Sequence, residues 1–232
     1  MSRSPVITGL FTVALLAGVA WFAVSPAQVM GDGGGKSVMV PAPVSDATLA
    51  TAPTQQTVVF AGGCFWGIQA VFQHVKGVIS ARSGYSGGEA RTAEYERVST
   101  GMTGHAESVK VVFDPSQVTY GQLLHVFFSV AHDPTQKNRQ GPDEGSQYRS
   151  VVFYTTEEQQ RLTQSYIEQL ESAHVFKHRI VTEVVPLKAF YEAEAYHQDY
   201  ATRHPDSSYI QYNDAPKVVN LKAEFPTLYA GK

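Results

Sequence analysis

The sequence TVVFAGGCFWG, residues 57–67, joins an apolar run to a helical pattern around Cys64, the only cysteine of the chain. Residues 57–60 are β-branched or aromatic, which favours a short buried strand. Apolar residues then recur on one helical stripe, at Phe65, Ile68, Phe72 and Val75. This stripe predicts a helix that begins at about Cys64. At the start of a helix, unpaired N–H groups and the helix dipole favour the thiolate form of a cysteine, which is the reactive form. The alternative interpretation of Cys64 is a buried, inert cysteine.

Further segments follow this one along the chain. They are SGYSGG at 83–88, TGHAE at 103–107, HDPT at 132–135, RQGPDEGSQYRS at 139–150, YHQDY at 196–200 and FPTLY at 225–229. Together with the cysteine segment, they resemble the A-type peptide methionine sulfoxide reductases, in which a cysteine followed by Phe-Trp opens the first helix. The resemblance runs from about Thr57 to near the C-terminus.

The tail from Tyr209 to Lys232 departs from many members of that family. Those members carry one or two further cysteines near the C-terminus, which resolve the oxidised catalytic cysteine through a disulfide. The tail contains none. The chain is therefore similar to the single-cysteine type, with no bound cofactor. Its reductant would be an external thiol, either thioredoxin-like, glutaredoxin-like or a small molecule.

Composition limits the function classes. The chain has 232 residues, which suits one moderate domain or at most two small ones, and 43% hydrophobic residues supply a core. A formal net charge of −3 gives no electrostatic case for nucleic-acid binding. The histidines lack metal-ligand spacing with other donors, so no metal site is predicted.

The N-terminus differs in kind from the rest. Residues 5–30 carry no charged side chain, so we interpret residues 1–30 as a signal peptide or an N-terminal membrane anchor. Residues 31–56 are rich in Gly, Pro, Ala and Thr and lack periodicity, which indicates a flexible linker. Residues 57–232 then form the catalytic domain. These features predict an exported protein of the bacterial periplasm, soluble after cleavage or tethered to the inner membrane.

The order of elements predicts the fold class. Strands are expected at 57–60, from Gly77, and at 108–113, 149–154 and 180–185. Helices are expected from Cys64, at 120–130 after Thr119, at 156–172 behind a capping box, over most of 189–202, and at Pro216. Strands and helices without strict alternation favour α+β. The resemblance implies a two-layer α/β sandwich, with a central mixed, ferredoxin-like sheet wrapped by long loops.

The resemblance also implies catalytic roles. Cys64 would be the nucleophile and Glu107 the acid that protonates the departing oxygen. An acid needs an apolar setting that raises its pKa, because a solvated glutamate is ionised at neutral pH. Tyr95 and Tyr148 match tyrosines that hydrogen-bond the sulfoxide oxygen.

A substrate pocket is implied as well. Phe65 and Trp66 would form the wall that receives the methyl group, although aromatic residues also pack cores. Asp143 matches a carboxylate of the pocket, and a turn aspartate is the alternative.

The predicted function is thiol-dependent reduction of methionine (S)-sulfoxide, free or in proteins, through a Cys64 sulfenic acid. The (S) stereochemistry comes from the resemblance alone. The predicted partners are oxidised proteins, peptides or free methionine sulfoxide, and the thiol reductant; the chain is expected to be a monomer. Two alternatives remain open, a thiol peroxidase and a module that binds oxidised methionine without reducing it.

Overall fold

A mixed sheet forms the centre of this computed structural model, which describes Met1 and residues 40–231. Its strand order is β7-β6-β1-β3-β2-β8, and only β6 and β7 run parallel. The strands are β1 (Gln56–Ala61), β2 (Val78–Ser86), β3 (Ala106–Phe113), β6 (Val151–Tyr154), β7 (Glu183–Pro186) and β8 (Tyr191–Glu192). The fold is therefore α+β, as predicted.

The signal peptide or anchor predicted at 1–30 lies, apart from Met1, outside the described residues. Among the described residues, no helix is long and apolar enough to cross a membrane.

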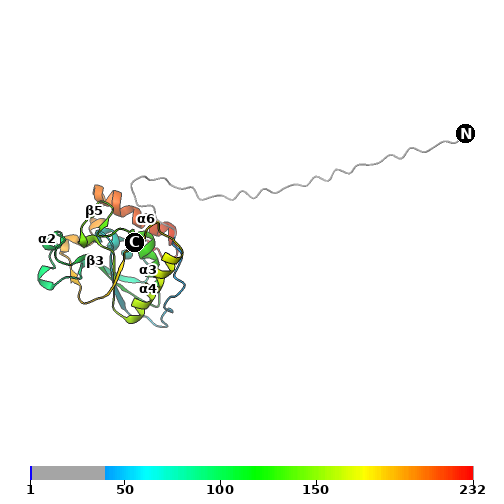
Figure 1. Cartoon of the computed structure of the whole chain (residues 1–232), viewed down its shortest axis with the longest axis horizontal. Helices are drawn as coiled ribbons and strands as arrows, with labels where there is room; N and C mark the ends of the chain where they lie inside the picture. The colour runs from blue at the N-terminus through cyan, green and yellow to red at the C-terminus, as the bar shows by residue number, and fades with distance from the viewer. Residues whose placement is uncertain (2–39, 232) are drawn as a thin grey trace. The chain divides into compact units, whose positions relative to one another are not determined.

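Helices pack on one face of this sheet. They are α1 (Phe65–Gln73), α3 (Tyr120–Val126) continued by η2 (Phe127–Ala131), α4 (Glu157–Ser172) and α6 (Ala215–Glu224). α3 and α4 lie on the same side of the domain in Figure 1, joined by a 2.7 Å hydrogen bond between the hydroxyls of Tyr120 and Thr163. The buried ring of Phe60 stacks between Phe72 and Phe127, with ring centroids 4.9 and 4.6 Å away.

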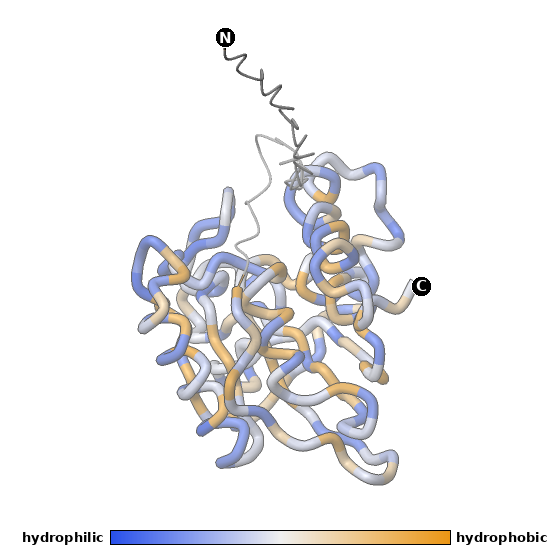
Figure 2. The backbone as a smooth tube through the Cα atoms, turned by 90° about the vertical axis from the view of Figure 1, so that its right-hand side faces the viewer, coloured by the Kyte–Doolittle hydropathy of each residue, from blue (hydrophilic) through white to orange (hydrophobic). Residues whose placement is uncertain are grey.

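The strands alternate between two apolar layers. Val58 and Phe60 of β1 face the large core, whereas Val59 and Ala61 belong to a smaller cluster that includes Phe153 of β6. In Figure 2, hydrophobic colour is frequent along the central segments, and hydrophilic colour is frequent on the outer loops. Those loops carry η1 (Ala90–Thr92), α2 (Tyr95–Val98), β4 (Arg139–Gln140), β5 (Asp143–Glu144), η3 (Ser146–Tyr148) and η5 (Ile210–Asp214).

Local sequence signals predicted the starts of α3 and α4 correctly. Thr119 caps α3 with a complete capping box to Gln122. Thr156 accepts the Gln159 backbone N–H at the start of α4, but the Gln159 side chain bonds to Thr155 and Thr57 instead of returning to the cap. The predicted capping box is therefore only half formed.

The prediction of a mostly helical segment at 189–202 is wrong. The chain forms β8, then η4 (Ala195–His197) and α5 (Tyr200–Arg203). The Gln198 side chain exchanges hydrogen bonds of 3.0 and 2.9 Å with the backbone of Ser83 on the edge of β2. Asp199 follows with a φ of 55°, which interrupts a right-handed helix. Pairing with the sheet edge outweighs the local helical pattern.

The flexible linker predicted at 31–56 is wrong for residues 40–55. Val40 is buried, and its carbonyl accepts a 2.8 Å hydrogen bond from His125 of α3. The Tyr166 hydroxyl of α4 donates to the Pro41 carbonyl at 2.8 Å, and Asp46 accepts the Gly121 N–H at 2.7 Å. These bonds attach the segment to the outer side of α3 and α4, where a composition rich in Pro and Ala gave no sign of them.

Candidate active site

Cys64 lies at the N-cap of α1, directly after two glycines that turn the chain out of β1. Gly63 has a φ of 98°, and a Cβ there would come within 2.5 Å of the Gln140 side chain. A Cβ on Gly62 would come within 2.7 Å of the His132 ring. Only glycine fits this tight turn, which explains the Gly-Gly before the cysteine. The turn leaves Cys64 8% exposed at the edge of the main core.

The surroundings of Cys64 favour the thiol over the thiolate. Burial raises the pKa of the Cys64 thiol well above its ordinary value, and the charges of Glu107 and Asp214 raise it further. The Trp66 backbone N–H and the Lys217 ammonium act in the opposite direction. The expected stabilisation by the helix N-terminus is therefore present, but burial outweighs it.

Glu107 brings a buried carboxyl group to the same helix end. It lies on β3 opposite Tyr85 of β2, is 2% exposed, and accepts the Phe65 backbone N–H at 3.1 Å. Burial raises the pKa of Glu107 to about 8; Asp143 and Asp214 add to the rise, and the Phe65 hydrogen bond opposes it. The carboxyl is thus mostly protonated at neutral pH, as a proton donor requires.

Tyr95 and Tyr148 reach the site from two separate loops. Tyr95 opens α2, Tyr148 ends η3, and both are half-buried. Burial raises the pKa of each phenol, and the charges of Glu107 and Cys64 raise it further. Both phenols therefore remain neutral hydrogen-bond donors near the carboxyl and the sulfur.

Asp143, on β5, is half-buried and accepts a hydrogen bond from the Tyr209 hydroxyl. Burial raises the pKa of the Asp143 carboxyl, while that hydrogen bond and the charge of Lys217 lower it. The structure thus gives Asp143 a partner from the C-terminal tail that the sequence did not reveal.

An aromatic wall stands beside the cysteine. Phe65 is 1% exposed, with its ring 5.9 Å from Tyr85 and 5.0 Å from His197. Trp66 is half-buried and stacks on Tyr200, with centroids 3.7 Å apart and planes inclined by 9°. Phe65 is thus part of the core, whereas Trp66 belongs to a partly open aromatic stack.

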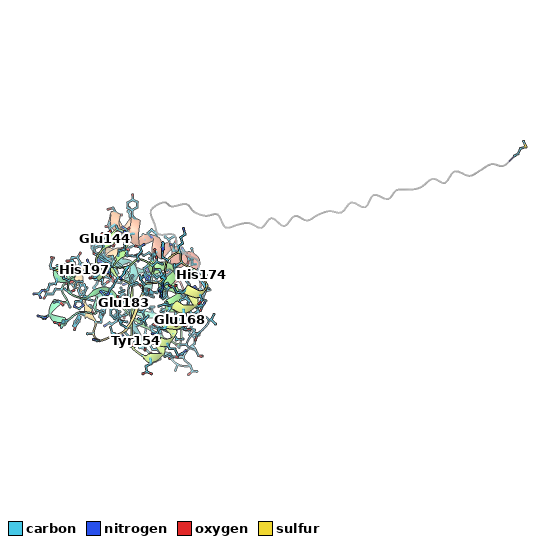
Figure 3. The ribbon with its side chains drawn as sticks, viewed as in Figure 1. Glu144, Tyr154, Glu168, His174, Glu183 and His197 are labelled. Atoms are coloured by element: carbon cyan, nitrogen blue, oxygen red, sulfur yellow. The ribbon has the colours of Figure 1, made fainter. Side chains whose placement is uncertain are left out.

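Sequence reasoning missed the group that supports this wall. The His197 Nδ1 accepts the Trp66 indole N–H at 3.3 Å, and Glu194 accepts both the Tyr95 N–H at 2.9 Å and the Tyr85 hydroxyl at 2.8 Å. In Figure 3, His197 is labelled on the side of the domain opposite His174. The only sequence signal was the quoted segment at 196–200, which the incorrect helix assignment concealed.

Asp214 and Lys217 were missed as well. They are three residues apart at the start of α6, a spacing that in sequence resembles an exposed helix pair. In the structure Asp214 is 1% exposed and accepts the Lys217 ammonium at 3.1 Å. Within residues 40–231, no His, Cys, Asp and Glu side chains are grouped to hold a metal ion.

Comparison with known proteins identifies the family of the chain. The family model described as peptide methionine sulfoxide reductase matches residues 56–228. Peptide methionine sulfoxide reductase MsrA 2 of Mesorhizobium japonicum is 59% identical over 78% of this chain and 93% of its own. The protein of the same name from Synechocystis is 51% identical to this chain, over 82% of this chain and 89% of its own length.

Solved structures show the same fold. Reduced Mxr1 of Saccharomyces cerevisiae gives a TM-score of 0.61 at 30% identity, covering 71% of this chain and 92% of its own. Methionine sulfoxide reductase A of Corynebacterium diphtheriae gives a TM-score of 0.57 at 33% identity, covering 78% of this chain and 92% of its own. The family match extends over the whole segment from β1 through α6. The chain therefore belongs to the peptide methionine sulfoxide reductase family.

Proposed function

We propose that the chain reduces methionine sulfoxide, free or within proteins, to methionine, with Cys64 as nucleophile and Glu107 as proton donor. One observation carries this mechanism. The hydrogen bond from the Phe65 N–H to Glu107 places a buried, largely protonated carboxyl beside the residue that follows the only cysteine. A nucleophile and an acid at one helix end are the two groups that removal of a sulfoxide oxygen needs.

The first half-reaction moves one oxygen atom. The Cys64 thiolate attacks the sulfoxide sulfur and forms an S–S bond, and Glu107 protonates the oxygen. This oxygen then passes to the Cys64 sulfur as the substrate sulfur gives up both its S–O bond and the new S–S bond. The products are methionine and a Cys64 sulfenic acid, so the sulfoxide is reduced by two electrons and the cysteine oxidised by two. The proton lost by the thiol restores the Glu107 carboxyl, and no proton is consumed overall.

The phenols and the aromatic wall hold the substrate for this step. Tyr95 and Tyr148 donate hydrogen bonds to the oxygen as it gains negative charge, since neutral phenols donate without bringing a competing charge. The methyl group lies against Phe65 and Trp66. Asp143 accepts a polar N–H of the substrate backbone, in addition to the Tyr209 hydroxyl that it already binds.

Regeneration uses an external thiol, because the chain has no second cysteine. A thiol of the reductant condenses with the Cys64 sulfenic acid to give a mixed disulfide and water. A second thiol, from the same or another reductant, then attacks the disulfide and releases Cys64. The reductant is a thioredoxin-like or glutaredoxin-like protein or a small thiol, and the enzyme works as a monomer.

The test combines intact mass spectrometry with the Cys64→Ser variant. Exposure of the reduced enzyme to methionine (S)-sulfoxide, without reductant, should add one oxygen to Cys64 and release one equivalent of methionine. The (R)-epimer should do neither, and Cys64→Ser should fold but form no methionine. Methionine formation by that variant would exclude Cys64 as the nucleophile. Faster turnover of a peroxide than of the sulfoxide would instead identify a thiol peroxidase, and binding without oxidation a non-catalytic module.

Export is a separate part of the proposal. It is supported by the uncharged stretch at residues 5–30 behind Arg3. The full chain is then delivered to the bacterial periplasm, where it repairs oxidised proteins. Cell fractionation, followed by mass determination of the mature N-terminus, distinguishes a cleaved soluble enzyme from a membrane-tethered one. Recovery of the intact chain in the cytoplasm would contradict export.

A further inference from the structure

Asp214 and Lys217 form an ion pair that the proposed reaction does not use. The side chain of Asp214 has no solvent-exposed surface, and that of Lys217 keeps 17%. The ammonium bonds to Oδ1 of Asp214 at 3.1 Å, whereas the buried Oδ2 has no hydrogen-bond partner. A carboxylate that is buried and paired through only one oxygen is costly to keep, which calls for an explanation.

The pair packs directly on the helix that carries Cys64. A Cβ on Gly67, in the first turn of α1, would lie 2.1 Å from Oδ1 of Asp214 and 2.8 Å from the Lys217 ammonium. The absence of a side chain at Gly67 therefore makes room for the pair. Gly67 follows Cys64 by only three residues, and the charges of both Asp214 and Lys217 act on the Cys64 thiol.

Several titratable groups face Cys64, from different elements. Six of them interact with Cys64 directly: Glu107 of β3, Tyr95 of α2, Tyr148 of η3, Tyr209 before η5, Asp214 at the end of η5 and Lys217 of α6. Two more lie next to its neighbours, His132 against Gly62 and Asp143 near Glu107. Glu107 is mostly protonated at neutral pH and the phenols are neutral. Burial raises the pKa of the Asp214 carboxyl and the Lys217 ammonium lowers it; when ionised, Asp214 adds a negative charge near the sulfur, which the Lys217 ammonium opposes.

We propose that Asp214 is a positioning residue for Cys64, whose buried carboxylate, hydrogen-bonded to Lys217 through one oxygen only, holds the sulfur as a thiol until substrate binds. The proposal rests on the proposed function and deepens it. A thiol is oxidised by peroxides far more slowly than a thiolate. In an enzyme without a second cysteine to capture an unwanted sulfenic acid, this charge keeps the nucleophile intact between turnovers.

The test measures the rate of alkylation of Cys64 by iodoacetamide from pH 6 to 11, in Asp214→Asn and in the parent protein. Asn preserves the shape and the acceptor for Lys217 but removes the charge. A charge at this range changes the thiolate population by roughly tenfold. Alkylation at pH 7–8 should therefore become about tenfold faster in the variant. As the pH rises and Cys64 ionises in the parent as well as in the variant, the two rates should converge.

The shape of the pH profile separates charge from disturbance. If Asp214→Asn merely opened the site, alkylation would accelerate equally at every pH, and this would overturn the proposal. An unchanged profile would overturn it as well. Asp114→Asn is the matched control. Asp114 is also buried, but it follows the end of β3 that lies away from Glu107 and Cys64. The alkylation profile of this variant should equal that of the parent protein.

A second variant, Asp214→Ser, removes the carboxylate without adding bulk and is used if Asp214→Asn does not fold. Thermal unfolding shows whether each variant is folded. The pH profile of Cys64 alkylation in Asp214→Ser should show the same shift toward lower pH. Alkylation needs no sulfoxide and no reductant. A variant with an unshifted profile therefore contradicts the role of Asp214 alone, whereas failure of the parent enzyme to reduce sulfoxide contradicts the proposed function.

Discussion

The two ends of β3 carry buried carboxyl groups with opposite properties. Glu107, near its start, is 2% exposed, and burial raises its pKa to about 8. Asp114, directly after its end, is 4% exposed, and hydrogen bonds, that from Gln117 first, lower its pKa to about 2. The two lie about 23 Å apart along one strand, so the difference comes from their local surroundings.

The number of donors and the strength of desolvation together explain the difference. Asp114 accepts hydrogen bonds from the backbone N–H groups of Thr54 and Ser116, from the Ser116 hydroxyl and from the Gln117 amide, at 2.7–3.3 Å. Glu107 accepts a single N–H, from Phe65, and has further carboxylates nearby. Donors stabilise the charged form, and burial without donors destabilises it. The comparison separates a carboxylate that organises a loop from a carboxylic acid available for chemistry.

Glu107→Gln is the change with the largest expected effect. The amide keeps the size of the side chain and its acceptor for the Phe65 N–H, but it has no transferable proton. Proton transfer by a positioned side chain typically contributes about 10²–10⁴-fold, so kcat for methionine sulfoxide should fall within that range. Single-turnover measurements of methionine release check this. A rise in KM with kcat preserved would assign Glu107 to binding instead.

The pH dependence of kcat/KM is the next largest effect. The reacting pair needs a proton on Glu107 and none on Cys64. Below about pH 8 both groups hold their protons, and between about 8 and the higher pKa of the Cys64 thiol they share one. The value of kcat/KM should therefore rise up to about tenfold per pH unit below 8, level off, and fall above the thiol pKa.

Steady-state rates with free methionine sulfoxide from pH 6 to 10 test this profile. In Glu107→Gln the limb near pH 8 should disappear, since only the Cys64 thiol then titrates. A profile that falls through pH 8 in the parent enzyme would mean that the reactive form carries both protons, and the thiolate step would then be wrong.

The phenols should show a smaller effect. Replacing Tyr95 or Tyr148 singly by Phe removes one hydrogen bond to the developing oxygen charge and should lower kcat by about tenfold, whereas the double variant should lose more than the product of the two. The remaining phenol partly compensates in each single variant. Strictly multiplicative losses would show that the two hydroxyls act on separate atoms.

Parts of the fold defined by local rules could be predicted from the sequence. The strand before Cys64, the helix after it, and the cap at Thr119 depend on neighbouring residues and were correct. The segment at 189–202 and residues 40–55 depend on bonds to distant partners, Ser83 and Tyr166 among them, which no local pattern reveals.

The site divides in the same way. The motifs indicated Cys64 and Glu107. Cys64 lies at the start of α1 and Glu107 at the start of β3, and both element starts can be predicted from neighbouring residues. The Asp214 and Lys217 pair became visible only through its packing on Gly67, because a charge pair at this spacing is usually exposed. Tertiary contacts alone decide which charges are buried.

Asp114→Asn should have the smallest effect on catalysis and completes the comparison along β3. It leaves the site untouched, so kcat and KM should stay within about twofold of the parent values. Stability should change instead. A carboxyl with a lowered pKa contributes stability above its unfolded value near 3.8, and that contribution is lost as pH falls toward about 2. The parent domain should therefore lose more thermal stability than Asp114→Asn between pH 4 and 2, as measured by unfolding midpoints. Equal losses would mean that the donors around Asp114 bind the neutral amide as well as the carboxylate. The contrast with Glu107 would then reflect burial alone.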